Sequence, residues 1–129
     1  MKRKGFFTEL RSAAYLRRRG FTVLKTRYRA GQGEIDLIAL DKGTTCFIEI
    51  KQSKGLGDGQ MRVNAEKRAR IRSAAKCWLL SHPTDSIRFD VLEESDAGLL
   101  LTFIPIRILY FKINRAEASK SKKQDAQPV

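Results

Sequence analysis

The chain has 129 residues, of which 26 are Lys or Arg and 14 are Asp or Glu, so its formal net charge is +12 at pH 7. This length corresponds to one domain with a single core, and the basic charge favours a polyanionic partner, nucleic acid before an anionic membrane. No apolar run approaches the roughly 18 residues of a membrane span, and no leader pattern opens the chain, so we expect a cytoplasmic protein without membrane attachment.

The first expected element is a helix over residues 8–19, capped by Thr8 and ended by Gly20. Its apolar arc, which should pack on a sheet, comprises Phe6, Phe7, Leu10, Ala13 and Ala14. Glu9, at the margin of this arc, is the one acid among ten Lys or Arg in residues 1–29. It is either a first-turn carboxylate favoured by the helix dipole or a functional group that faces the sheet.

Residues 21–28 read as a strand, and residues 33–51 read as a β-hairpin because apolar and polar residues alternate on both sides of Lys42 and Gly43. If these two are the turn residues, Asp36 lies opposite Glu49. In the same register Glu34 lies opposite Lys51, and all four side chains share one face.

Two carboxylates that face each other in a sheet destabilise it unless something compensates their repulsion. A divalent cation is the obvious candidate, because Mg²⁺ binds one or two carboxylates together with waters and substrate phosphates. Lys51 would then orient a water or stabilise charge on a phosphate. The alternative is a solvated face on which Glu34 and Lys51 form an ordinary ion pair.

A glycine-rich loop over residues 52–59 precedes a second helix, which is capped by Asn64 and ends at His82-Pro83. Lys67 lies on the apolar arc of this helix, so it either extends its head to solvent or contacts phosphate near the hairpin acids. The single histidine is expected in a loop and rules out zinc sites built on several histidines. Cys46 and Cys77 are expected to be buried thiols.

Two further strands are expected over residues 87–92 and 99–104, joined by a turn over residues 93–98. The element order is therefore α-β-β-β-α-β-β, an α/β fold with a mixed sheet flanked by helices. Residues 106–113 could form an edge strand or a short helix. We expect one domain over residues 1–113 and a disordered basic tail over residues 114–129.

The run GEIDLIA…FIEIK, followed by Lys67, Arg70-Ile71, Ala74-Ala75, Trp78-Leu79 and then RFDV, resembles the YraN family of small bacterial proteins. A helix Glu, a strand Asp and Glu-x-Lys on the next strand also resemble the PD-(D/E)XK superfamily of restriction-endonuclease-like nucleases. Within that superfamily the chain is similar to archaeal Holliday-junction resolvases. The resemblance covers residues 8–92 and implies a restriction-endonuclease-like fold.

Carried over position by position, the resemblance implies that Asp36, Glu49 and the backbone carbonyl of Ile50 bind one or two Mg²⁺ or Mn²⁺ ions. Glu9 would hold the metal through water, and Lys51 would help to deprotonate the attacking water. Two departures stand out: Thr8 replaces the family's usual Gly, and the usual Asn-Ala-Phe strand ending is absent, so residues 93–113 are not covered.

The function expected is a metal-dependent endonuclease that hydrolyses phosphodiester bonds in DNA, particularly branched or structured DNA. Lys54, Lys67, Arg29 and Arg70 are the expected phosphate contacts, and a homodimer would suit a two-fold symmetric junction. The alternative is a catalytically silent nucleic-acid-binding protein of the same fold that acts with a partner.

Overall fold

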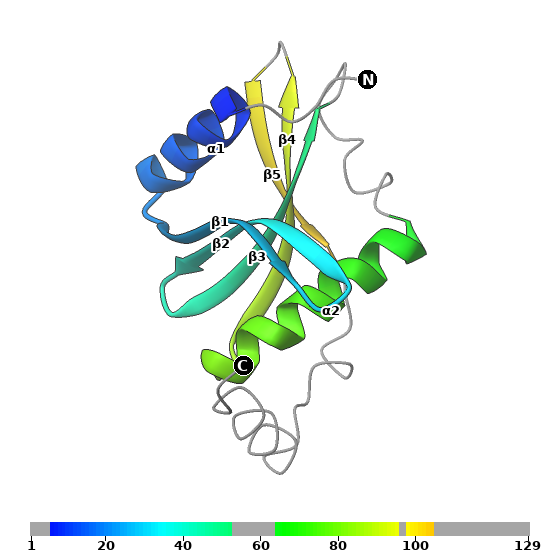
Figure 1. Cartoon of the computed structure of the whole chain (residues 1–129). Helices are drawn as coiled ribbons and strands as arrows, with labels where there is room; N and C mark the ends of the chain where they lie inside the picture. Colours follow the sequence, from blue (N-terminus) through cyan, green and yellow to red (C-terminus); the bar gives the residue numbers. More distant parts are fainter. Residues whose placement is uncertain (1–5, 53–63, 96–97, 105–129) are drawn as a thin grey trace.

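A computed structural model describes residues 6–52, 64–95 and 98–104, which form a five-stranded mixed sheet with a helix on each face (Figure 1). The elements are α1 (Phe6–Arg18), β1 (Thr22–Ala30), β2 (Gly33–Asp41), β3 (Thr44–Gln52), α2 (Ala65–Ser81), β4 (Ile87–Ser95) and β5 (Gly98–Ile104). This order is the one expected from the sequence. The loop at 53–59, the segment 106–113 and the tail at 114–129 lie outside the described residues.

The strands lie in the order β1-β2-β3-β4-β5. Only β3 and β4 pair in parallel, with α2 as the connection between them; the other three pairs are antiparallel. A helical crossover between parallel strands is the arrangement that such a connection requires.

The β2–β3 hairpin has the expected register from Leu37↔Ile48 to Asp41↔Thr44. Its turn residues Lys42 and Gly43 both have positive φ, 50° and 86°. Positive φ at both central residues is what a type I′ turn requires, and the twist of that turn matches the twist of the two strands that it joins. The Lys42-Gly43 turn therefore fixes which residues of β2 and β3 lie side by side.

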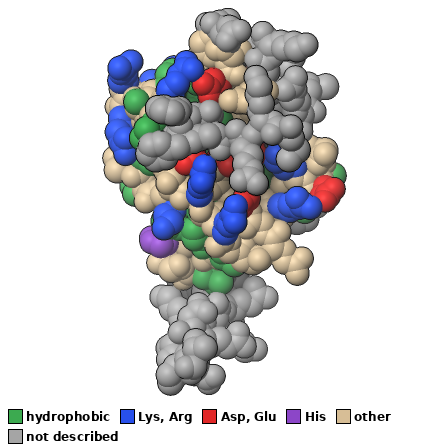
Figure 2. Space-filling view, turned by 45° about the horizontal axis from the view of Figure 1, so that its top comes forward, with side chains coloured by type: hydrophobic (Ala, Val, Ile, Leu, Met, Phe, Trp, Pro, Cys, Tyr) green, Lys and Arg blue, Asp and Glu red, His purple; other side chains and the backbone are tan. Residues whose placement is uncertain are grey.

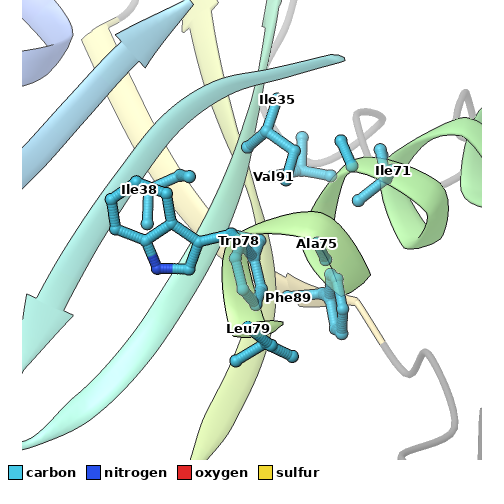
Figure 3. Close-up of a cluster of buried hydrophobic side chains, with 10 residues drawn as sticks. Ile35, Ile38, Ile71, Ala75, Trp78, Leu79, Phe89 and Val91 are labelled. Atoms are coloured by element: carbon cyan, nitrogen blue, oxygen red, sulfur yellow. The ribbon is translucent and has the colours of Figure 1, made fainter. Parts of the chain in front are cut away.

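The sheet separates two hydrophobic cores, each built on one helix. The first packs α2 residues against the sheet and includes Ile35, Ile38, Phe47, Ile71, Ala75, Trp78, Leu79, Phe89 and Val91 (Figure 3). The second, on the α1 side, comprises Leu16, Phe21, Leu37, Ala39, Cys46, Ile48, Ile50 and Leu92. Burial of side chains of this size, at about 1.5–3 kcal/mol each, is what stabilises the two layers.

Strand β2 is irregular at Asp36. Ile35 and Ile38 both pack on the α2 side, whereas Leu37 and Ala39 pack on the α1 side. Strict alternation would place Ile35 and Leu37 on the same side, because successive side chains of a strand point to opposite faces. The change of side between Ile35 and Leu37 therefore falls at Asp36, next to the end of the β2–β3 ladder.

Helix α2 is held against the turn between β1 and β2. A Cβ atom added at Gly33 would lie 1.8 Å from the carbonyl oxygen of Arg70, so the helix backbone occupies the space that any side chain would need. The backbone N–H of Gln32 donates to Ser73 Oγ over 2.9 Å. The expected cap is confirmed: Asn64 Oδ1 accepts the backbone N–H of Lys67, also at 2.9 Å. These contacts fix where the first turn of α2 begins.

The predicted buried face of α1 is partly wrong. Ala13 is buried as predicted, but Leu10 and Ala14 are exposed, and Ser12 and Leu16 are buried instead. Leu16, which the predicted arc omitted, fills the core beside Phe21, and the helix is therefore rotated about its axis relative to the prediction. The backbone N–H of Phe21 donates to the Leu16 carbonyl. The helix also begins at Phe6, so the residue expected as its cap lies inside it.

The predicted turn at residues 93–98 is shorter than expected, because β4 continues to Ser95 and β5 begins at Gly98. Glu93 and Glu94 are both buried in β4 rather than exposed in a turn. Glu is rarely buried, so the burial of these two residues in a strand was not visible in the pattern. Of the three residues added to the strand, Glu93 and Glu94 bring acidic side chains to the end of the sheet where Lys51 lies.

The local expectations for Cys46 and His82 are confirmed, and the one for Cys77 is confirmed only in part. Cys46 is a buried free thiol, and Cys77 is a half-buried one. His82 caps the C-terminus of α2 and stacks on Trp78, with ring centroids 3.8 Å apart. Over the described ranges, neither helix has the length and apolar character needed to cross a bilayer.

Candidate functional site

Glu49 on β3 is the most buried of the predicted catalytic residues that the structure describes, with 4% of its surface exposed. Its Oε1 lies 3.1 Å from Nζ of Lys67 and 3.7 Å from Nζ of Lys51. A buried carboxylate is costly unless cations or hydrogen-bond donors surround it. Two lysines from different elements, α2 and β3, supply that charge, so the first turn of α2 takes part in the site directly.

Asp36 on β2 is also almost fully buried, with 9% exposed. Its Oδ2 accepts the backbone N–H of Ile50 over 2.8 Å. The β2–β3 ladder ends at Leu37↔Ile48, so the expected pairs of Asp36 with Glu49 and of Glu34 with Lys51 are not part of it. The Asp36 carboxylate therefore takes the place of a ladder acceptor, and it reaches the β3 backbone at the residue that follows Glu49.

Glu9 is on the sheet-facing side of α1. It precedes the buried residues Ser12, Ala13 and Leu16 by three, four and seven positions, which places all four on one helical face. Its carboxylate forms an ion pair with the guanidinium of Arg27 on β1. Glu9 thus points towards the sheet, and its described contact is with an arginine.

Arg27 was not anticipated by sequence reasoning. It has φ 49°, a left-handed conformation that is uncommon for a residue with a side chain. It stands between the pairs Thr26↔Leu37 and Tyr28↔Ile35, and is therefore level with Asp36. Its pKa is raised by the hydrogen bond and charge of Glu9, with smaller contributions from Asp36 and Glu34. One cation thus lies near acids from α1 and β2.

Glu93 on β4 is a second residue that sequence reasoning missed. It is fully buried and pairs in register with Lys51 of the neighbouring strand. Val91 packs on the α2 side, so Glu93, two residues further along the strand, points to that side as well. The predicted catalytic lysine therefore lies beside two buried carboxylates, Glu49 on its own strand and Glu93 on the next.

The predicted phosphate contacts fall into different settings. Lys67 lies in the site, paired with Glu49. Arg29 bonds Glu34 at 3.0 Å, and Arg70 bonds Glu66 at 2.7 Å, both at the surface. Lys54 belongs to the part of the chain that the structure does not describe. Figure 2 shows Lys and Arg side chains distributed around the Asp and Glu side chains on one face of the molecule.

A second charged cluster lies on the α1 side of the sheet and has a structural role. Arg88 bonds Asp90 within β4 at 3.0 Å and reaches Asp41 at the end of β2 at 3.2 Å. Burial raises the pKa of Asp90, and the bond to Arg88 opposes that rise. These contacts tie the end of the hairpin to β4, and they explain the polar residues of the RFDV segment without a functional role.

The acids of the site fit a hard divalent cation by donor type. Within the described ranges, no group of three or more His, Cys, Asp or Glu side chains is arranged to hold a metal ion. Mg²⁺ does not require three, because it binds through one or two carboxylates with waters and phosphates completing its octahedron. Asp36 and Glu49, both buried and on adjacent strands, would supply those two carboxylates.

Residues 8–93 match the model of a family described as "Uncharacterised protein family UPF0102". A UPF0102 protein of Rhodopseudomonas palustris strain BisA53 is 40% identical over 93 residues, which cover 70% of this chain and 72% of that protein. A UPF0102 protein of Halorhodospira halophila is 39% identical over 93 residues, covering 70% and 76%. The matched segment contains Glu9, Asp36, Glu49 and Lys51, and the chain belongs to the YraN-like family UPF0102.

Proposed function

We propose that this protein is a metal-dependent endonuclease that hydrolyses phosphodiester bonds in DNA, with branched or otherwise structured DNA as its substrate class. One observation carries the proposal. Asp36 and Glu49, two carboxylates that are each at least nine-tenths buried, lie on adjacent strands beside a lysine, in a chain of net charge +12. Buried acids clustered with a lysine are costly to fold, and such clusters are typical of functional sites.

Each residue of the site would have a distinct role. Asp36 and Glu49 would supply oxygen ligands to Mg²⁺ or Mn²⁺, together with the Ile50 carbonyl, and Glu9 would approach from α1 through a water. The metal, when bound, would polarise the phosphate and make water a better nucleophile. Lys51, beside Glu49, would orient that water and stabilise the charge that develops on the phosphate oxygens.

The basic surface would bind the DNA backbone. Lys67, Arg29, Arg70 and Lys54 would contact phosphates, which position the duplex without reading its sequence. Binding through such contacts weakens steeply as salt rises, because counterions are released when the phosphates are neutralised. The resemblance to junction resolvases supports branched DNA as the substrate, and a homodimer would suit the two-fold symmetry of a junction.

A catalytically silent nucleic-acid-binding protein is the second candidate. It is favoured by the contacts of Glu49, whose carboxylate is already neutralised by Lys67 and Lys51. In that case the acids would be structural ion pairs, and the protein would act with a catalytic partner.

Cleavage assays separate the two candidates. Labelled four-way junction, flap, single-stranded and linear duplex DNA would be incubated with wild-type protein and Asp36→Asn, with Mg²⁺, Mn²⁺ or EDTA. The nuclease requires metal-dependent cutting, most rapid on branched DNA, that Asp36→Asn loses while it still binds DNA. If neither protein cuts and both bind in a salt-sensitive manner, the binding protein replaces the nuclease. Equal cutting by both proteins would rule out Asp36 as a ligand.

A further inference from the structure

We infer that nucleic acid and the divalent cation bind this site cooperatively, because Lys67 and Arg27 are counter-ions that exchange their carboxylate partners for DNA phosphates. The inference rests on the proposed function, since it concerns the same acids and the same two ligands. It adds a regulation that the proposed function does not contain: two basic side chains oppose metal binding at the acids until a polyanion draws them away.

The first step is the competition at Glu49. The ammonium of Lys67 lies 3.1 Å from Glu49 Oε1, which is an oxygen that a metal ion would also bind. A metal ion on this oxygen and the Lys67 ammonium would be like charges in close contact. Like charges repel strongly where solvent is largely excluded. A divalent cation at Glu49 therefore requires Lys67 to move away, and it binds more weakly while Lys67 stays.

Arg27 is the corresponding counter-ion of Glu9, the acid on α1. Its guanidinium is paired with Glu9, and its charge also acts on Asp36. Arginine side chains bind phosphate in a bidentate manner, so a phosphodiester offers Arg27 a replacement for its carboxylate. Both cations are partly open to solvent, with 57% of the Arg27 and 36% of the Lys67 side chain exposed. A DNA backbone can reach them from outside.

The second step follows from linkage. Phosphates that draw Lys67 and Arg27 away from the acids lower the cost of placing a metal ion there. By reciprocity, a bound metal ion raises the affinity for DNA by the same factor. Coupling between sites is typically about 5- to 150-fold in affinity. The protein would thus load its metal chiefly on DNA.

The test measures the affinity of the protein for Mn²⁺ from the electron paramagnetic resonance signal of free Mn²⁺. Each titration is carried out in the cold, with and without a short DNA duplex. Gel analysis would check that the duplex stays intact. The same titration of Asp36→Asn with the duplex is the control, and it gives the amount of Mn²⁺ that the DNA alone binds. For wild-type protein we expect the duplex to tighten Mn²⁺ binding by about tenfold, within the usual range of coupling.

Two matched variants on α2 locate the coupling. Lys67→Met keeps the length of the side chain and removes the charge at Glu49, so it should bind Mn²⁺ several-fold more tightly without DNA and lose most of the tightening by DNA. Lys76→Met removes an exposed charge from the same helix. It should keep the Mn²⁺ affinity and the coupling of wild-type protein, although its DNA affinity falls.

The outcomes distinguish this inference from the proposed function. If wild-type protein binds Mn²⁺ equally with and without DNA, or if Lys67→Met and Lys76→Met show the same coupling, the inference is wrong even when the protein cleaves DNA. If DNA tightens Mn²⁺ binding through Lys67 but no substrate is cut, the inference holds and the nuclease proposal fails.

Discussion

The ammonium nitrogen of Lys67 lies 3.1 Å from Oε1 of Glu49, so the first turn of α2 is joined to β3 at the buried acid of the site. Three contacts set this position: the Asn64 cap on the Lys67 backbone, the bond from Gln32 to Ser73, and the approach of Arg70 to Gly33. The site is therefore sensitive to changes in the turn between β1 and β2, which carries no predicted catalytic residue.

Gly33→Ala should destabilise the protein more than Gly43→Ala does. The new methyl group would lie 1.8 Å from the Arg70 carbonyl oxygen, and α2 must shift to admit it. Overpacking of this kind costs about 1–3 kcal/mol or more. Gly43→Ala is the control, because it has φ 86° and open space around it, so its loss should stay near 1 kcal/mol. Urea unfolding would measure both, and equal losses would contradict the close packing at Gly33.

Asp36→Ala should destabilise the fold more than Asp36→Asn. Both remove the charge, but Asn retains an oxygen that can accept the Ile50 N–H. Alanine leaves that buried donor unsatisfied, which costs about 1–3 kcal/mol. The free energies of unfolding of the two variants, compared with each other, isolate this bond. Variants of equal stability would show that the bond does not stabilise the end of the hairpin.

Arg27→Gly should be more stable than Arg27→Ala. Both lose the ion pair with Glu9, but only alanine keeps a Cβ atom at φ 49°. The left-handed conformation costs a residue with a Cβ about 1–2 kcal/mol, and glycine adopts it freely. Thermal unfolding of the pair would show the difference. A less stable glycine variant would mean that Arg27 does not hold this conformation in solution.

Cys46 should resist thiol reagents in the native protein. Burial raises the pKa of its thiol to about 12, so the reactive thiolate is scarce at neutral pH. Because the folded state holds the proton more tightly, the stability that Cys46 contributes is complete below its ordinary pKa and is lost as pH rises towards 12. Labelling followed by mass spectrometry should modify Cys46 only after denaturation. Rapid labelling of Cys46 in native protein would contradict its burial.

The hairpin that carries Asp36 and Glu49 could be predicted because its signals are local. Alternating residues and the Lys42-Gly43 turn set the register of the ladder from Leu37↔Ile48 to Asp41↔Thr44. Asp36 lies just beyond this ladder, and its bond to the Ile50 N–H brings it to the β3 residue that follows Glu49. Asn64 was likewise identified by its position before a periodic segment, and with it the start of α2.

The surroundings of these acids depend on contacts between distant segments and could not be predicted. Arg27 carries no sequence signal for a left-handed conformation, and its pairing with Glu9 requires α1 to lie across β1. Glu93 belongs to a run of acids that is typical of a turn, and its burial follows from the pairing of β3 with β4. The face of α1 was misjudged because Leu16 is buried with Phe21, which lies beyond the end of the helix.

The most direct test of the account is cleavage of a labelled four-way junction by wild-type protein and by Glu49→Gln in Mg²⁺. Glutamine keeps the size of the side chain and removes the charge that Lys67 and Lys51 surround. We expect metal-dependent cleavage by the wild-type protein and a loss of at least about a hundredfold in the variant, with circular dichroism showing that both are folded. Cleavage at the wild-type rate by Glu49→Gln would contradict the assignment of this carboxylate to the site.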